Sequence, residues 1–198
     1  MISKFFKTTR RLKDRLSKTS PLRGFSLIEA LVSVLLLTGA ITGPLSIAAQ
    51  GFQGALVARD QVTAFFLAQD AVEFVQFARA TNRLNPNNYD WLAGGTGGVV
   101  LTPCVSTDGS ALCYFDSMQT GVFSCGGACG AMKYDPSTRA YNYDTGVQTP
   151  QKFTRTVKIE TPVSGSAGEA ALTVTVAWQD QGLLTRSVTV REHITNWQ

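Results

Sequence analysis

The sequence predicts an α+β fold in which a long N-terminal helix packs on a small antiparallel sheet. Three observations lead to this prediction: an uncharged apolar run near the N-terminus, a stretch of helical periodicity directly after it, and three alternating apolar–polar segments near the C-terminus. The helix would have a membrane half and an amphipathic half. The amphipathic half would cover one face of the sheet.

The first element is a membrane or filament-core helix at 25–50. Residues 30–58 contain no charged side chain, and about 20 apolar residues cross a bilayer core as a helix. Residues 1–24 carry eight Lys or Arg against one acid. This bias keeps the N-terminus in the cytoplasm and sends the C-terminal head outside. We therefore expect a single-pass protein of an inner membrane, with the lipid bilayer as its first partner.

The helix is expected to continue as an amphipathic segment at 51–82. Residues 55–80 lack Gly and Pro, and their apolar side chains recur at helical spacing. The expected apolar face consists of Ala58, Val62, Phe65, Val72 and Val75. Glycines and Pro44 interrupt the earlier half, which predicts a bend or local melting near 42–44. Turn formers and a proline at 82–88 end the helix.

A glycine-rich, poorly periodic loop is expected at 83–150, with short strands at 99–102 and 111–115. It contains all four cysteines, Cys104, Cys113, Cys125 and Cys129. An even number of cysteines in an exported domain favours disulfides. Of the three possible pairings, the first with the second and the third with the fourth closes the smallest loops. A four-cysteine metal site is the alternative, although these spacings fit common zinc sites poorly.

The last segment, 151–198, is expected to form the sheet. Residues 153–161, 171–178 and 184–193 alternate apolar and polar side chains and are rich in β-branched residues. A loop of hairpin length at 179–182 joins the last two. The expected inward side chains are Val174, Val176, Trp178, Val188 and Val190.

The heptapeptide 23–29, RGFSLIE, stands at the start of the apolar run and places Glu29 five residues after Gly24. A carboxylate in a membrane segment costs a few kcal/mol unless it meets a partner, so such groups are functional candidates. The alternative is a tolerated polar residue that reaches for the headgroups. Glu29 is therefore a candidate assembly residue.

Gly24 to Glu29 match at every position the pattern Gly, Phe, Ser or Thr, Leu, Ile, Glu of type IV pilins and type II secretion pseudopilins. The resemblance implies a pilin-like fold and a leader, 1–24, that a prepilin peptidase removes between Gly24 and Phe25. Phe25 would become the N-methylated N-terminus. Glu29 would pair with the N-terminal amine of a neighbouring subunit, which offsets part of the desolvation cost of both charges.

Other stretches are similar to minor pilins and to I-type minor pseudopilins. They are the hairpin over 172–190, the terminal Asn196-Trp197, and Leu67-Ala68-Gln69 followed by Glu73. The resemblance implies a minor structural subunit of a pilus (fimbrium) or secretion pseudopilus. Its partners would be other pilin or pseudopilin subunits and an inner-membrane platform protein driven by a cytoplasmic ATPase. A 24-residue leader and cysteines placed before the final sheet depart from the commonest family pattern.

Two other functions stay open. A secretory signal peptide cut after Ala48 would release a soluble protein. Alternatively, the loop at 88–150 would act as a filament-tip adhesin or ligand-binding surface, although we expect its aromatic residues to pack the loop down. Those aromatic residues are Trp91, Tyr114, Tyr134, Tyr141 and Tyr143.

The sequence does not favour an enzyme or a cofactor. The single histidine, His193, adjoins Glu192 in an expected strand, where neighbours point to opposite faces. The glycines at 94–98 lack the Gly-Lys-Ser/Thr end of a phosphate loop. Without residues 1–24 the chain has ten Lys or Arg against thirteen Asp or Glu, a net charge of −3. We therefore predict no metal and no direct nucleic-acid partner.

Overall fold

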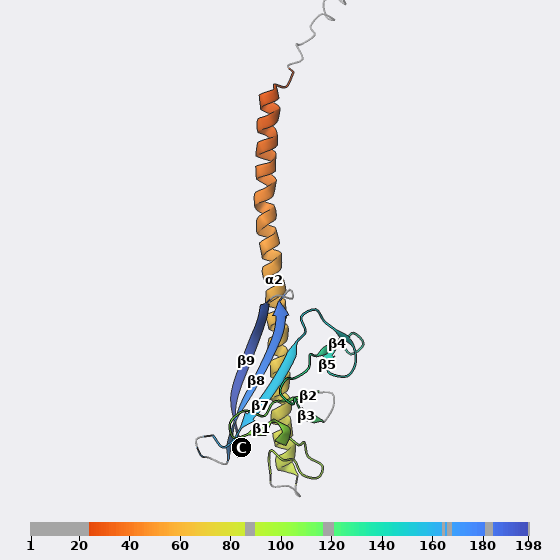
Figure 1. Ribbon diagram of the computed structural model, residues 1–198, viewed down its shortest axis with the longest axis vertical. Coiled ribbons are helices and arrows are strands. Elements are labelled where there is room, and N and C mark those ends of the chain that lie inside the picture. The colour runs from red at the N-terminus through yellow and green to blue at the C-terminus, as the bar shows by residue number, and fades with distance from the viewer. Residues whose placement is uncertain are drawn as a thin grey trace, which may run out of the picture. The chain divides into compact units, whose positions relative to one another are not determined.

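The computed structural model describes residues 24–85, 90–116, 121–163, 165, 168–180 and 184–197 (Figure 1). The chain divides into two compact units, one ending at Phe52 and one beginning at Gln53. The predicted leader, apart from its last residue, lies outside the described residues. The elements are α2 (Leu27–Leu84), η1 (Thr102–Cys104), β1 (Val105–Ser106), β2 (Cys113–Phe115), β3 (Val122–Ser124), β4 (Lys133–Asp135), β5 (Ala140–Asn142), β6 (Val147–Gln148), β7 (Thr154–Glu160), β8 (Glu169–Asp180) and β9 (Leu184–Thr195).

The first unit contains the N-terminal part of α2, up to Phe52. The helix runs through Pro44 without a break, so the local melting predicted near 42–44 is wrong for this structure. Proline removes a single backbone donor, and the neighbouring helical bonds hold the turn. The Thr38 and Thr42 hydroxyls donate hydrogen bonds to backbone carbonyls about one turn earlier in the helix, at 3.0 and 3.4 Å.

In the second unit, α2 turns a face rich in small residues toward the sheet. Its buried side chains are Asp60, Ala64, Leu67, Ala68, Ala71, Phe74, Val75, Ala78 and Asn82. The predicted face is right at Val75 and partly right at Val72, but Ala58, Val62 and Phe65 are exposed. Alanines let the helix backbone approach the strands closely. A search for large apolar residues at helical spacing does not detect a face made of alanines.

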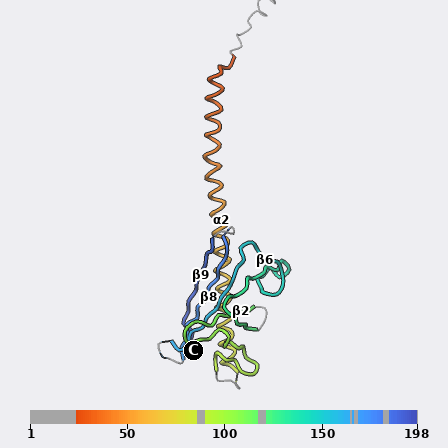
Figure 2. Tube along the Cα trace, in the orientation of Figure 1, coloured from red at the N-terminus to blue at the C-terminus, as the bar shows by residue number. Residues whose placement is uncertain are grey.

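The sheet beside this part of α2 has the order β3-β2-β7-β8-β9, with β1 parallel to β7. All three C-terminal strands are confirmed. Strands β8 and β9 pair antiparallel from Glu169↔Thr195 to Asp180↔Leu184. Residues 179 and 180 of the predicted hairpin loop belong to β8, and residues 181 and 182 lie outside the described residues. Figure 2 shows these strands running beside α2. A hydrogen bond of 2.7 Å from the Gln76 side chain on α2 to Glu192 on β9 joins the two elements.

One hydrophobic core joins the helix to the sheet, which makes the second unit a two-layer α+β domain. The Phe74 and Phe115 rings stack with centroids 4.0 Å apart. The inward positions predicted on the strands hold, since Val174, Val176 and Trp178 are buried and the two β9 valines pack partly buried against the same core.

The region 83–150 contains more structure than predicted. The expected strand at 111–115 appears as β2, but the one at 99–102 is wrong. Both backbone groups of Val99 bond to the Asn82 side chain at 2.8 Å, in place of a neighbouring strand. A second small sheet of order β5-β4-β6 follows. The predicted turn that ends the helix lies partly outside the described residues.

Candidate functional sites

The Gly24–Phe25 peptide bond lies just before the helix, which begins at Leu27. Phe25 is 76 % exposed, and a Cβ added at Gly24 would meet no described atom within 4 Å. The Ser26 carbonyl accepts the Ala30 N–H at 3.0 Å and starts the helical ladder. This bond is therefore accessible within the described part of the chain.

Glu29 occupies the first turn of α2 and is exposed. A carboxylate is favoured there by the helix dipole. Its backbone carbonyl accepts the Ser33 hydroxyl at 2.7 Å. Among the residues described here, its carboxylate takes part in no hydrogen bond or ion pair. The carboxylate is thus available to a group outside this chain.

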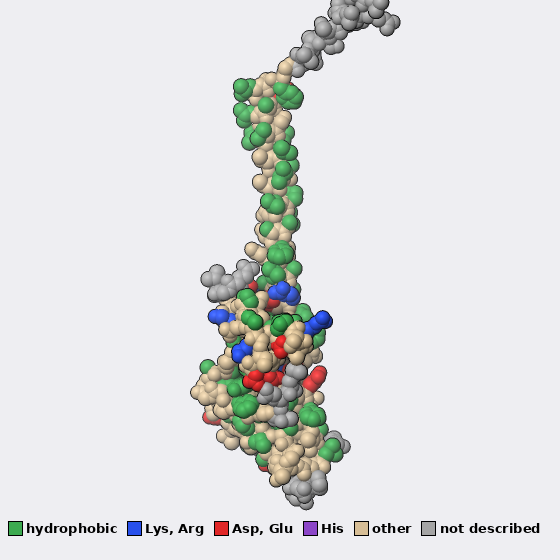
Figure 3. Space-filling view, turned by 90° about the vertical axis from the view of Figure 1, so that its right-hand side faces the viewer, with side chains coloured by type: hydrophobic (Ala, Val, Ile, Leu, Met, Phe, Trp, Pro, Cys, Tyr) green, Lys and Arg blue, Asp and Glu red, His purple; other side chains and the backbone are tan. Residues whose placement is uncertain are grey.

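Large apolar side chains are exposed along the helix of the first unit, and Figure 3 shows those on one face. This helix is long and apolar enough to cross a membrane, and no residue of its most apolar stretch is buried. Exposed apolar surface of this extent marks a membrane or protein contact. The exposed side chains are Phe25, Leu27, Ile28, Leu31, Val32, Val34, Leu35, Leu36, Leu37, Ile41, Leu45, Ile47 and Phe52.

The four candidate cysteines form two disulfides, Cys104–Cys113 and Cys125–Cys129. These are the pairs that close the smallest loops. The first disulfide is fully buried in the core between η1 and β2, whereas the second lies half-exposed at the base of a glycine-rich turn.

The aromatic residues considered for ligand recognition pack mainly against other side chains. Trp91 is buried. Tyr114 lies against Tyr143 with centroids 4.5 Å apart, and Tyr134 lies against Tyr141 at 5.3 Å. Burial raises the pKa of Tyr143 above its ordinary value, and its hydroxyl donates to the Arg155 carbonyl at 3.2 Å. These contacts favour loop packing over a free recognition surface.

Arg155 is a key residue that sequence reasoning missed. Its side chain is 1 % exposed and links α2 to the sheet. The guanidinium donates to Asp70 and to the Leu67 carbonyl on the helix, and to the Phe115 carbonyl at 2.6 Å on β2. Its place in the inward register of β7, two residues before the buried Val157, is the signal that could have revealed it.

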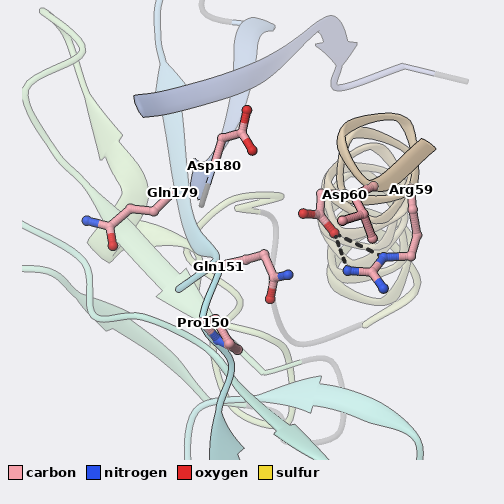
Figure 4. A pocket seen from close by; sticks show the side chains of 7 residues that line it. Arg59, Asp60, Pro150, Gln151, Gln179 and Asp180 are labelled. Carbon is pink, nitrogen blue, oxygen red and sulfur yellow. Dashed lines mark hydrogen bonds and ion pairs between the residues drawn. The ribbon is translucent and has the colours of Figure 1, made fainter. Parts of the chain in front are cut away.

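A pocket of about 390 Å³ lies between α2, residues 150–151 before β7 and the C-terminal end of β8 (Figure 4). Asp60 is buried there and accepts the Nε and Nη2 donors of Arg59 on its Oδ1, at 3.2 and 2.9 Å. We call this the Asp60 pocket. Its main lining residues are Arg59, Asp60, Pro150, Gln151, Gln179 and Asp180.

The remaining candidates do not assemble into a site. His193 is exposed on the outer face of β9, while Glu192 turns to the helix and bonds to Gln76. The glycines at 94–98 form tight turns beside Asn82. Comparison of the chain with protein-family models, with curated proteins and with solved structures finds no match.

Proposed function

We propose that this chain is a minor pilin-like or pseudopilin structural subunit. It is processed after Gly24, anchored through its N-terminal helix, and assembled into a pilus or secretion pseudopilus by helix packing. The observation that supports it best is the order of features at 24–29. An accessible glycine–phenylalanine bond stands directly before an exposed apolar helix, and the glutamate in its first turn has no partner among the described residues.

Assembly would bury two kinds of group together. The apolar side chains of the first unit gain about 25 cal/mol for each Å² removed from water. Where they already lie in lipid, the helices associate through close van der Waals packing instead. The Glu29 carboxylate gains a counter-charge when the Phe25 ammonium of a neighbouring subunit reaches it. The pair would fix the axial register between subunits, which apolar packing alone leaves free to slide.

The N-terminus of the membrane-extracted protein tests processing. Mass spectrometry should find an N-terminus at Phe25, methylated or not, in the wild-type chain. Gly24→Val should abolish the cut, because the peptidase of this family cuts after glycine. Gly39→Val is the matched control, since that glycine also has open space around it. An N-terminus near Ala49 in both the wild-type chain and the Gly24→Val variant would instead establish a secreted soluble protein.

The role of Glu29 is tested by filament assembly. Glu29→Ala should keep the chain in the membrane and reduce its incorporation into filaments at least about tenfold, the factor that corresponds to 1.4 kcal/mol. Glu73→Ala, which removes an exposed acid from the same helix, should assemble normally. Equal incorporation of both variants would rule out the pairing. Stoichiometry in purified filaments would separate a minor from a major subunit.

A further inference from the structure

The Asp60 pocket holds a buried carboxylate with one unused oxygen. Asp60 is only 7 % exposed, and both of its bonds from Arg59 end on Oδ1. Figure 4 shows the other oxygen on the side of the helix that faces Gln151 and the strand end. Within the described chain, Oδ2 accepts no hydrogen bond. Because Asp60 lines the pocket, a ligand there that donates to Oδ2 gains a charge-assisted hydrogen bond.

The charges around the pocket are ordered, with acids inside and cations outside. Asp180 is nearly buried and accepts the Arg186 Nε on Oδ2 at 2.9 Å. Arg59 lines the pocket with a side chain that is 62 % exposed, and Arg186, which bonds to the lining residue Asp180, is 45 % exposed. Each retains N–H donors beyond its bond to an aspartate. This arrangement is complementary to a zwitterion with an ammonium group and an anionic group.

The pocket also follows the apolar segment closely in sequence. Its first helical residue, Leu56, comes four residues after Phe52, the last exposed apolar residue of the first unit. In a membrane-anchored chain the residues just beyond the span lie among the lipid headgroups. The zwitterion most available to these residues is therefore a phospholipid headgroup.

We propose that the Asp60 pocket binds the phosphoethanolamine headgroup of a membrane phospholipid. The primary ammonium donates to Asp60 Oδ2, and the phosphate accepts from Arg59 and Arg186. A choline headgroup has no N–H to donate, so it fits less well. Free phosphate is disfavoured by the inner carboxylates. This inference rests on the proposed function, because it requires an anchored chain.

Lipid retention by the full-length protein tests the proposal. The protein would be placed in nanodiscs that contain equal parts of phosphatidylethanolamine and phosphatidylcholine, and released for native mass spectrometry. We expect the wild-type chain to retain phosphatidylethanolamine in preference, and Asp60→Asn to reduce that preference about tenfold, as for one charge-assisted hydrogen bond. Asp108→Asn, at an exposed aspartate outside the pocket, should change nothing. Equal retention of the two lipids by the wild-type chain would overturn the proposal.

Soluble probes test whether the pocket binds the whole headgroup more tightly than its phosphate or its amine alone. Titrated into the full chain in detergent, O-phosphoethanolamine should shift the Gln151 and Gln179 amide resonances, whereas inorganic phosphate or ethylamine alone should bind at least about tenfold more weakly. Equal binding of phosphate would show an anion site and overturn the proposal. Arg186→Gln, at an exposed side chain, should weaken O-phosphoethanolamine binding and serves as the second variant if Asp60→Asn unfolds.

Failure of this inference can be told from failure of the proposed function. A Phe25 N-terminus without any preference for phosphatidylethanolamine rejects the lipid site alone. An N-terminus near Ala49 removes the anchor and rejects the proposed function, whatever the soluble headgroup does.

Discussion

Arg155 is a charged side chain held almost wholly out of water, and its partners explain why the fold tolerates it. A buried cation is stable only when it is paired and hydrogen-bonded. Asp70 supplies the charge, and two carbonyls from different elements supply acceptors. The Phe115 ring also lies below the guanidinium, 5.0 Å from it. The arginine therefore sets the position of α2 against β2 and β7.

Replacing Arg155 with methionine should cost about 1–3 kcal/mol of unfolding free energy, because the Phe115 carbonyl then stays buried without its donor. Unfolding of the full chain in detergent, followed by circular dichroism, measures this. Arg191→Met is the matched control, because Arg191 lies exposed on β9 and should change stability by less than about 0.5 kcal/mol. Equal effects from both substitutions would contradict the linking role of Arg155.

Tyr143 should make the protein sensitive to alkali. Burial raises its pKa, a shift that the nearby Arg155 charge opposes. Because the folded pKa is above the unfolded value of about 10, this tyrosine stabilises the fold fully below pH 10 and loses its contribution as pH rises through the folded pKa. Tyr143→Phe should cost about 1 kcal/mol at neutral pH through its lost hydrogen bond. The gap to the wild type should close above pH 10, and a constant gap in unfolding at each pH would contradict this.

At the scale of elements, the end of α2 is fixed to the following loop by the buried Asn82. Its amide donates to the Trp91 and Val99 carbonyls, at 3.1 and 2.8 Å, and its oxygen accepts the Val99 N–H. Gly98 lies against this network, since an added Cβ would stand 2.5 Å from the Asn82 Oδ1 and closer still to the Gly94 carbonyl. The loop therefore requires a residue without a side chain at that position.

Gly98→Ala should destabilise the second unit by about 1–3 kcal/mol, the usual cost of overpacking. Gly130→Ala is the control, because a Cβ there meets nothing within 4 Å. Thermal unfolding of both variants, with the full chain in detergent, gives the comparison. A Gly98 variant as stable as the Gly130 variant would show that the loop can move aside at little cost.

The two disulfides should differ in their resistance to reduction. Cys104 and Cys113 are fully buried, while Cys125 and Cys129 are partly exposed, and exposed disulfides exchange faster with added thiols. Mild dithiothreitol followed by alkylation and peptide mass spectrometry should label the exposed pair first. Chain unfolded in guanidinium, where both disulfides are accessible, is the control. Simultaneous labelling of all four cysteines in the folded protein would contradict this order.

Much of the element order was predictable because its causes are local. Alternating side chains define the three long strands, and an uncharged run followed by helical periodicity defines α2. The buried helix face was harder to predict, because alanines rather than Val62 and Phe65 line it. The Asp60 pocket left no local signal at all. Its lining comes from residues near 60, 150 and 180, which only the fold brings together.

At the scale of the whole molecule, the two units differ in how their apolar residues are used. Every buried apolar residue of the described core lies between Ala64 and Ile194, within the second unit. In the first unit the large apolar side chains are exposed, as in a helix that contacts lipid or another protein. None of the described residues up to Phe52 therefore contributes to the hydrophobic core of the second unit.

A fragment of residues 53–198 should consequently fold alone and stay soluble without detergent. Its unfolding free energy should lie within about 1 kcal/mol of the transition that the full chain shows in detergent, because the fragment keeps every residue of the described core. Denaturant unfolding followed by near-ultraviolet circular dichroism, which reports the packed Trp91 and Trp178, is the measurement. The full chain without detergent is the control and should aggregate. A fragment that keeps its helical signal but loses its near-ultraviolet signal would mean that the anchor helix takes part in packing the head, and the division into two independent units would then be wrong.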